Sequence, residues 1–417
     1  MKIAVLCPHF PPDTAPTGEV IGRLVAELAA LGHELHVVTA LPWYLHHRVE
    51  REWSGRHIRR ERTTWGSITR VNPFPTDKRS IARRGAAFAG FSALAGLSGL
   101  RGGRVDAVLA MSPPLTLGVT GWVMSLVRRG PLVFNVQDVF PDAAVELGAV
   151  RNKQLIAAAR LLERASYRLA SAVTVLSDEM ADNVSAKVSA ARRGRVCVIP
   201  NFVDTDAVRP VDRMTMYRHE LGIGDETVVM YAGNVGLSQS LHLLVEAARR
   251  YRDDPSVVFV VNGGGSNLAA IQRSAAGLPN VRFAPYQPKD RLAEVLGTGD
   301  IHLIPLRASL AQSSVPSKMY SILAAGRAVL ASIDEGTEVA RVVTGARAGL
   351  AVPPDDQSAF DTALDALIAD PQGRVSMGGR GRAWVETWAS PAAVAALYDD
   401  LFSRVARRNL SELSASR

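Results

Sequence analysis

The stretch Ser313–Ala331, SSVPSKMYSILAAGRAVLA, follows the apolar run Ile301–Leu306 and decides how this sequence folds. The apolar run is typical of a buried strand of a parallel sheet. Apolar residues then recur at helical spacing, and Gly326 is suited to end the helix. The next apolar run, Ala328–Ala331, predicts another strand. The unit is strand, turn, helix, glycine and strand, which is the repeat of an α/β fold.

The turn before this predicted helix carries Ser317 and Lys318. Backbone N–H groups at a helix start attract anions, whereas a cation in the first turn opposes the helix dipole. Lys318 therefore indicates that an anion binds at this turn. A solvated surface lysine on an ordinary strand–helix unit is the alternative, and the local residues leave both interpretations open.

The length and composition indicate a globular protein of two or three domains. The chain has 417 residues, of which 47% are hydrophobic and 21% charged. Its cysteines, Cys7 and Cys197, lie far apart in strand-like runs, which favours a reducing cytoplasm over a disulfide. The N-terminal run is short and breaks at proline, as in a first strand rather than a signal peptide. We expect a cytoplasmic protein, soluble or peripheral on the inner face of the plasma membrane.

The positive charge is concentrated in the region 48–104. This region holds 13 Lys or Arg against 4 Asp or Glu, an excess of 9, so the rest of the chain sums to about −1 of the total +8. Within it, the small apolar segment 85–100 is too short to span a bilayer but suits a helix lying at a membrane surface. A buried helix with a solvated basic rim fits equally well. Nucleic acid is a weaker possibility because the aromatic residues are not interleaved with the arginines.

The chain begins as a strand–helix–strand unit. Lys2–Leu6 predicts a strand, and a long proline-rich turn then leads to Gly18 and a helix over about Glu19–Leu31. Gly18 stands where a backbone can approach a ligand closely. The turn lacks the GxGxxG pattern of dinucleotide folds, which argues against a nicotinamide enzyme.

Asp138 is the candidate active-site carboxylate. It follows Gln137 at the end of the predicted strand Leu132–Val136, and the carboxyl ends of parallel strands are where α/β folds keep ligands. An aspartate that caps the next helix is the alternative.

The strand–helix alternation stops near Pro210 and restarts at Thr227. In the second half, the glycine turns Gly233–Gly236 and Gly263–Gly265 each leave a predicted strand, and each could hold phosphate through backbone N–H groups. Together with Lys318 they lie on three turns of one sheet. Two such halves predict two Rossmann-like domains with a cleft between them.

The sequence predicts no metal site. Asp204-Thr205-Asp206 has the DxD form that holds a divalent metal in many sugar-nucleotide enzymes, but it lies in the linker, where it is interpreted as linker polarity and helix capping. No His, Cys and carboxylate cluster has zinc spacing.

Several segments together resemble the GT-B glycosyltransferases of the large retaining family 4, and most of all the bacterial colanic-acid and O-antigen fucosaminyltransferase-like enzymes. The segments are HFPPDTAPTGEVIGRLVAELAALGHELHVVT, IPNFVDT, YAGNVGLSQSLHLLVEAA and VPSKMYSILAAGRAVLAS. The resemblance implies metal-independent transfer, with retention, from a nucleotide-diphosphate sugar and without a cofactor. It also implies GT-B architecture, with the acceptor on the N-terminal domain, the donor on the C-terminal domain and a terminal helix that crosses back.

The resemblance also assigns site residues. It places Gly18 at the donor phosphates and Tyr286-Gln287 at the base, and it makes Asp138 the group that orients or deprotonates the acceptor hydroxyl. Asn234 and Gln239 stand where most of the family has Arg and Lys, so Lys318 becomes the expected source of positive charge. The expected donor-binding residues are Gly18, Asn234, Gly236, Gln239, Gly264, Tyr286, Gln287, Ser317, Lys318 and Glu338.

One departure concerns the family's pair of glutamates, whose places are taken by Ser313 and Ser321. The second glutamate usually holds the ribose hydroxyls, and Glu338 is a plausible substitute.

The predicted domains are 1–205, 206–385 and the crossover segment 386–417. The expected function is sugar transfer to a polyprenyl-linked or other lipid-linked glycan acceptor in cell-surface polysaccharide synthesis. A sugar-nucleotide 2-epimerase and a non-catalytic nucleotide-sugar-binding or membrane scaffold protein are the alternatives.

Overall fold

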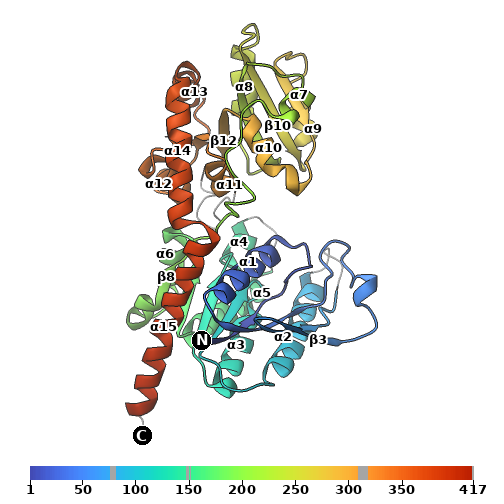
Figure 1. Cartoon of the computed structure of the whole chain (residues 1–417), viewed down its shortest axis with the longest axis vertical. Coiled ribbons are helices and arrows are strands. Elements are labelled where there is room, and N and C mark those ends of the chain that lie inside the picture. The colour runs from blue at the N-terminus through green and yellow to red at the C-terminus, as the bar shows by residue number, and fades with distance from the viewer. Residues whose placement is uncertain (76–80, 147–149, 151, 309–317, 416–417) are drawn as a thin grey trace. The chain divides into compact units, whose positions relative to one another are not determined.

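The structure, a computed structural model, describes residues 1–75, 81–146, 150, 152–308 and 318–415. The chain forms two compact units. The first comprises Met1–Asn201 with Val394–Arg417, and the second comprises Phe202–Ala393. The predicted boundaries were 205/206 and 385/386. Each unit is a largely parallel sheet with helices, which confirms the predicted pair of Rossmann-like domains (Figure 1).

The first unit contains an eight-stranded sheet in the order β3-β4-β2-β1-β5-β6-β7-β8. All neighbours are parallel except β3 and β4. Its central strands are fully buried apolar runs, as expected when helices cover both faces of a parallel sheet. The strands are β1 (Lys2–Leu6), β2 (Glu34–Ala40), β3 (Ile58–Thr63), β4 (Gly66–Val71), β5 (Ala107–Ser112), β6 (Leu132–Val136), β7 (Ala172–Val175) and β8 (Val196–Val198).

The helices of the first unit follow the predicted alternation. α1 begins earlier than predicted, because its proline suits the first helical turn. They are α1 (Pro16–Ala30), α2 (Ile81–Gly99), α3 (Thr116–Arg128), α4 (Asp142–Glu146), α5 (Lys153–Leu169) and α6 (Asp178–Ala186). No described helix is long and apolar enough to cross a membrane.

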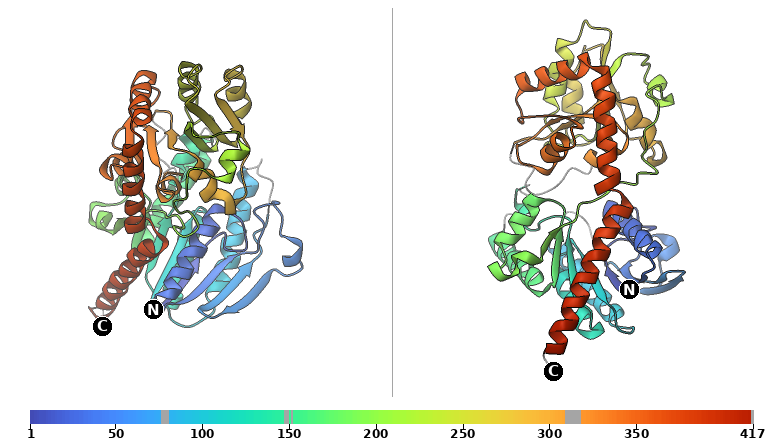
Figure 2. Two further views of the ribbon diagram at one scale, coloured as in Figure 1. Left: turned by 45° about the horizontal axis from the view of Figure 1, so that its top comes forward. Right: turned by 60° about the vertical axis from the view of Figure 1, so that its left-hand side comes forward.

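The C-terminal helix α15 (Pro391–Ala415) returns to the first unit from Val394 onward (Figure 2). Tyr398 on this helix is buried and fully hydrogen-bonded to the sheet: its hydroxyl accepts a bond of 2.9 Å from Asn135 Nδ2 and lies 3.3 Å from Thr174 Oγ1. A buried phenol that finds such partners fixes the helix in one position. The predicted crossover helix is therefore confirmed.

A hairpin that the sequence analysis did not predict lies within the basic region. β3 and β4 pair antiparallel at the edge of the sheet (Figure 1). Arg70 on β4 is only 2% exposed, and its guanidinium donates to Glu61 Oε1 at 3.0 Å and to the carbonyl of Pro11 at 2.5 Å. This arginine of the basic region is therefore buried, and it holds the first strand–helix loop in place.

The second unit contains a six-stranded parallel sheet in the order β11-β10-β9-β12-β13-β14. Its strands are β9 (Thr227–Asn234), β10 (Val257–Gly264), β11 (Val281–Ala284), β12 (Ile301–Pro305), β13 (Ala328–Ser332) and β14 (Gly349–Val352). Its helices are α7 (Met216–Glu220), α8 (His242–Arg250), α9 (Leu268–Ser274), α10 (Leu292–Thr298), α11 (Lys318–Ala324), α12 (Glu338–Gly345), α13 (Gln357–Ala369) and α14 (Pro371–Trp388). Gly326 follows α11 with a φ of 65°, the conformation expected of a glycine that ends a helix.

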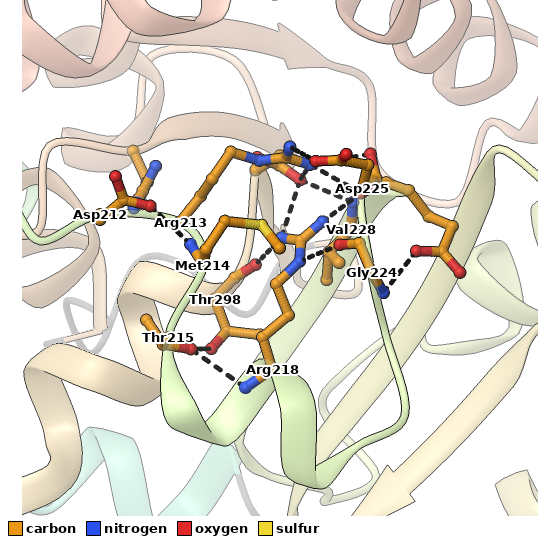
Figure 3. Close-up of polar contacts among 12 residues, drawn as sticks. Asp212, Arg213, Met214, Thr215, Arg218, Gly224, Asp225, Val228 and Thr298 are labelled. Carbon is orange, nitrogen blue, oxygen red and sulfur yellow. Dashed lines mark hydrogen bonds and ion pairs between the residues drawn. The ribbon is translucent and has the colours of Figure 1, made fainter.

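At the amino end of this sheet, a buried ion-pair network ties the segment after the linker to the strands (Figure 3). Asp300 accepts two bonds from Arg213, at 2.9 and 3.1 Å, and one of 2.8 Å from the N–H of Val228. The fully buried Arg218 donates to Asp300 Oδ2 at 3.4 Å and to the carbonyl of Thr298 at 3.0 Å. Every charge in the network therefore has a partner of opposite sign.

Candidate functional site

The carboxyl end of the second sheet is formed by two glycine segments that pair with each other. β9 and β10 continue through the predicted turns, with Gly233 opposite Gly263 and Asn234 opposite Gly264. Gly263 has a φ of 144°, and a Cβ there would lie 2.0 Å from the carbonyl oxygen of Gly233. The prediction that the glycines end the strands is therefore wrong by up to three residues, because only glycine permits this close pairing. The result is a floor of glycine backbone, formed by Gly233, Gly263 and Gly264.

Lys318 lies directly against this floor. The position of a Cβ at Gly233 is 3.3 Å from Lys318 Nζ. The ammonium group donates a 2.8 Å hydrogen bond to Tyr231 Oη and lies 4.0 Å from the centre of the Tyr231 ring. Tyr231 Oη in turn donates to the carbonyl of Asn234 at 2.5 Å. Among the described residues, no carboxylate forms an ion pair with Nζ.

Burial lowers the pKa of Lys318 to about 7. The cause is desolvation, since no described carboxylate offsets the loss of water around the ammonium group. A cation that is buried without a counter-charge lowers the stability of the folded protein unless an anion binds to it. The arrangement therefore supports the anion-site interpretation over a solvated lysine.

The two amides that replace cations of the family face the same floor. Gln239 Oε1 accepts a 2.8 Å bond from the N–H of Gly236, and Gln239 Nε2 donates to Ser238 Oγ at 2.8 Å. A Cβ at Gly236 would lie 2.9 Å from Asn234 Nδ2, so Asn234 and Gln239 flank that glycine. The structure thus brings Asn234, Gly236, Gln239 and Lys318 together.

Tyr286 and Gln287 follow β11, and only the first touches the glycine floor. Tyr286 is 58% exposed, and its hydroxyl donates to the carbonyl of Gly264 at 3.2 Å. Gln287 instead accepts a bond of 3.3 Å from Arg291 Nη1 and donates to the carbonyl of Pro285 at 3.2 Å. An exposed aromatic ring beside the floor can stack on a planar base.

Glu338 begins α12, where its carboxylate accepts a 2.8 Å bond from Arg341 Nη2. No contact among the described residues joins it to Lys318, so its role at a ribose stays a prediction. Ser321 lies on α11. Ser317 and Ser313 lie outside the described residues.

In the first unit, Gly18 is buried near the start of α1. A Cβ at Gly18 would lie 3.0 Å from Cβ of His9. The glycine therefore allows the first strand–helix loop to pack closely on the helix, and its predicted approach to phosphate stays a prediction.

Asp138 follows β6 on a loop that is held from behind by amides. Gln137 donates to Asn135 Oδ1 at 2.7 Å and accepts from Asn201 Nδ2 at 2.9 Å. Burial raises the pKa of Asp138, which makes this half-buried carboxylate a stronger base than an exposed aspartate. The side chain is thus suited to accept a proton or hydrogen bond from a hydroxyl.

The DxD sequence forms a local turn. Asp204 Oδ1 accepts 3.0 Å bonds from the N–H groups of Asp206 and Ala207, so it caps a turn and not the predicted helix. The described residues contain no group of three or more His, Cys, Asp or Glu side chains that could hold a metal ion.

The sequence analysis missed Tyr231, the direct partner of Lys318. Its signal was an aromatic residue two positions before Gly233, on a strand whose neighbouring residues are aliphatic. Tyrosine can line a buried strand with its ring and still present a hydroxyl at the strand end.

Comparisons with known proteins identify relatives of both units. Residues 17–201 match the family described as "Glycosyl transferase 4-like domain", and residues 226–370 match "Glycosyl transferases group 1". A putative colanic acid biosynthesis glycosyl transferase, WcaI of Escherichia coli strain K12, is 28% identical over 380 residues, which cover 88% of this chain and 91% of WcaI. The probable glycosyltransferase WbjE of Pseudomonas aeruginosa is 27% identical over 274 residues, which cover 64% of this chain and 67% of WbjE.

Solved structures with the same fold span almost the whole chain. A sucrose-phosphate synthase from Thermosynechococcus elongatus superposes with a TM-score of 0.74 at 18% identity, covering 97% of this chain and 99% of that protein. Anabaena HepE, solved in complex with UDP-glucose, superposes with a TM-score of 0.67 at 15% identity, covering 97% of this chain and 100% of HepE. At these identities the likeness shows the fold alone.

Proposed function

Since the chain belongs to the GT-B glycosyltransferases of family 4, near the colanic-acid and O-antigen enzymes, we propose that it is a retaining, metal-independent enzyme with a lipid-linked acceptor. It transfers a sugar from a nucleotide-diphosphate sugar in cell-surface polysaccharide synthesis. In our proposal the bond between the anomeric carbon and the diphosphate breaks, and the acceptor hydroxyl oxygen forms the new bond on the same face of the sugar.

The ammonium group of Lys318, which has no carboxylate partner among the described residues, is the observation that carries the donor assignment. Negative charge develops on the diphosphate as it leaves, and a cation already fixed at that place stabilises it without reorganisation. The glycine floor supports this role, because Gly233, which has no side chain, is the residue of the floor that faces Lys318 Nζ. The resident cation takes the part that a bound metal ion plays in other sugar-nucleotide enzymes.

On the acceptor side, we assign Asp138 to the hydroxyl that attacks. Its raised pKa favours proton acceptance, and the hydroxyl proton passes to its carboxylate as the new C–O bond forms. Gln137, Asn135 and Asn201 act behind it as positioning residues, since their hydrogen bonds fix the loop after β6.

The surface of α2 and α3 supports contact with an anionic membrane. One side of α2 packs on the unit through buried Phe91 and Ala95, which agrees with the buried-helix alternative for that side. Its outward side is apolar, and Leu97 is 67% exposed, as are Leu126 at 59% and Val127 at 55% on α3. The exposed Arg101, Arg104 and Arg129 follow these two helices. Apolar side chains next to arginines are the composition that binds anionic lipid surfaces.

The donor proposal is tested by the thermal unfolding midpoint of the purified protein with UDP, GDP, ADP or TDP, each with and without Mg²⁺. We expect one nucleoside diphosphate to raise the midpoint selectively and independently of Mg²⁺, because binding to the native state alone stabilises it. No response to any diphosphate would favour the non-catalytic alternative. Stabilisation that requires Mg²⁺ would contradict the metal-independent assignment.

The membrane proposal is tested by flotation with vesicles of phosphatidylcholine alone and with added phosphatidylglycerol. We expect binding to the anionic vesicles only, and its loss in Leu97→Ser/Leu126→Ser. Equal flotation of that double variant would overturn the assignment of this surface. The exposed Val375→Ser in the second unit is the matched control.

A further inference from the structure

A second, separate pocket opens at the carboxyl end of the first sheet. It encloses about 330 Å³ and is lined by His9 after β1, Trp43 and Tyr44 after β2, Thr17 at the start of α1, and Phe88 on α2. At about 30 Å³ for each water molecule, that volume holds roughly ten waters, the size class of one sugar ring and not of an extended chain. The carboxyl ends of parallel strands are where α/β folds bind ligands.

Aromatic rings line the pocket together with prolines and alanines. The rings of His9 and Trp43 are stacked, with centres 5.7 Å apart and planes at 23°, and Tyr44 meets His9 edge-on at 5.4 Å. None of the described lining residues is Lys, Arg, Asp or Glu. The C–H face of a pyranose packs on such ring faces, whereas a phosphate would require cations.

His9 is fixed by a buried carboxylate. Its Nδ1 lies 2.6 Å from Asp13 Oδ2, and the Asp13 side chain is fully buried. The other carboxylate oxygen of Asp13 accepts a 3.0 Å bond from the N–H of Tyr44. Because an ionised carboxylate only accepts hydrogen bonds, Nδ1 carries the proton of this bond, and Nε2 is the ring nitrogen that remains to bond with a ligand. Nε2 has no hydrogen-bond partner among the described residues.

The loop that carries this pair is rigidly supported. Arg70 donates to the carbonyls of Phe10 and Pro11, at 3.4 and 2.5 Å. Gly18 and Gly22 of α1 allow the same loop to pack on the helix, since a Cβ at Gly22 would lie 2.5 Å from Pro11 Cγ. Such support is what holds a binding residue in one geometry before its ligand arrives.

We propose that this pocket is the subsite for the sugar ring of the acceptor, and that His9 determines which acceptor hydroxyl is presented. Trp43 and Phe88 contact the C–H faces of the ring, and Nε2 of His9 forms a hydrogen bond with one hydroxyl. The assignment as an acceptor site rests on the proposed function, whereas the pocket's affinity for an uncharged pyranose does not. A prenyl chain could fill an apolar pocket, but it has no polar group with which His9, held by the buried Asp13, could form a hydrogen bond.

Saturation-transfer NMR with the full-length protein tests the proposal. The probes are the methyl glycosides of glucose, galactose, mannose, fucose, rhamnose and N-acetylglucosamine, with geraniol as the prenyl probe. We expect at least one glycoside to give a saturable signal in the millimolar range. We expect its affinity to fall at least tenfold in Trp43→Ala and in His9→Ala, which is the loss of about 1.4 kcal/mol of binding free energy.

Matched controls are the exposed Trp388→Ala and His219→Ala in the second unit, which should leave the signals unchanged. Unaltered thermal stabilisation by the preferred nucleoside diphosphate shows that each pocket variant is folded. If the wild type binds a nucleotide but no glycoside, or if the signals survive in both pocket variants, the pocket assignment is overturned. Saturation of geraniol in place of the glycosides overturns it as well. If no nucleotide binds, the proposed function fails instead.

Discussion

The two ends of the second sheet both bury cations, and they treat them in opposite ways. At the amino end, Arg218 is fully buried but donates to Asp300 and to backbone carbonyls, while Arg213 forms a two-point pair with the same carboxylate. At the carboxyl end, the partners of Lys318 among the described residues are a tyrosine hydroxyl and a ring face.

The difference separates a structural charge from a functional one. A buried cation that has a carboxylate partner contributes to the integrity of the native state, and removing either partner leaves the other uncompensated. A buried cation whose described partners are all neutral is poorly stabilised until an anion arrives, which is the property expected at a site for a charged ligand. Burial alone therefore does not distinguish the two ends of the sheet, whereas the presence of a carboxylate does.

The largest expected effect is at the amino end. Asp300→Ala should lower the free energy of unfolding by about 3–5 kcal/mol, because the fully buried Arg218 and the half-buried Arg213 lose their shared counter-charge. Urea denaturation measures the change. Asp400→Ala, which breaks the exposed pair with Arg404, should cost at most about 1 kcal/mol. Equal stability of these two variants would contradict the structural role of Asp300.

The same carboxylate predicts how stability depends on pH. Burial acts to raise the pKa of Asp300, but the bonds from Arg213 and from the N–H of Val228, together with both guanidinium charges, leave it below its usual value. Its stabilising contribution is therefore complete above the unfolded-state pKa of about 3.9 and is lost as the pH falls through the lower folded-state pKa. The urea midpoint of Asp300→Asn should depend less on pH in this acidic range than that of the wild type.

The next largest effect is at the carboxyl end, on catalysis. Lys318→Met should reduce turnover by about 10²–10³-fold, the loss typical of removing one preorganised charge from a developing anion. The thermal midpoint should stay the same or rise, because the variant removes a buried amine without a described counter-charge. Lys153→Met, at an exposed lysine of the first unit, is the control. Near-normal turnover in Lys318→Met would contradict the proposed role of this lysine in stabilising the leaving diphosphate.

The smallest effect concerns the pH dependence of donor binding. With the pKa of Lys318 lowered to about 7 by burial, the free protein loses this charge as the pH rises above neutrality. The affinity for the preferred nucleoside diphosphate, measured by calorimetry, should fall by nearly tenfold between about pH 7.5 and 8.5, a range in which the phosphate itself no longer titrates. A flat profile in the wild type would contradict the model of charge pairing. Lys318→Arg, which stays charged, should bind with little pH dependence.

Much of the fold could be predicted from sequence because its signals are local. Apolar runs of strand length, helical periodicity and glycines after helices lie within short windows, so β1, β6, β12 and α11 emerge close to their observed bounds. The β3–β4 hairpin escaped prediction because its arginine-rich strands lie at a sheet edge and lack the apolar run of a buried strand.

The sequence by itself determined the two Rossmann-like units, the family and the candidate residues Lys318 and Asp138, since each follows from residue types next to a strand end. Only the tertiary structure decided what these residues meet. Tyr231 lies 87 positions from Lys318, and Arg70 lies 59 positions from the carbonyl that it holds. The pairing of Gly233 with Gly263 likewise depends on strand register. Such contacts are set by how the strands are ordered and paired, and a pattern within one stretch of chain carries no information about the side chain that another stretch brings beside it.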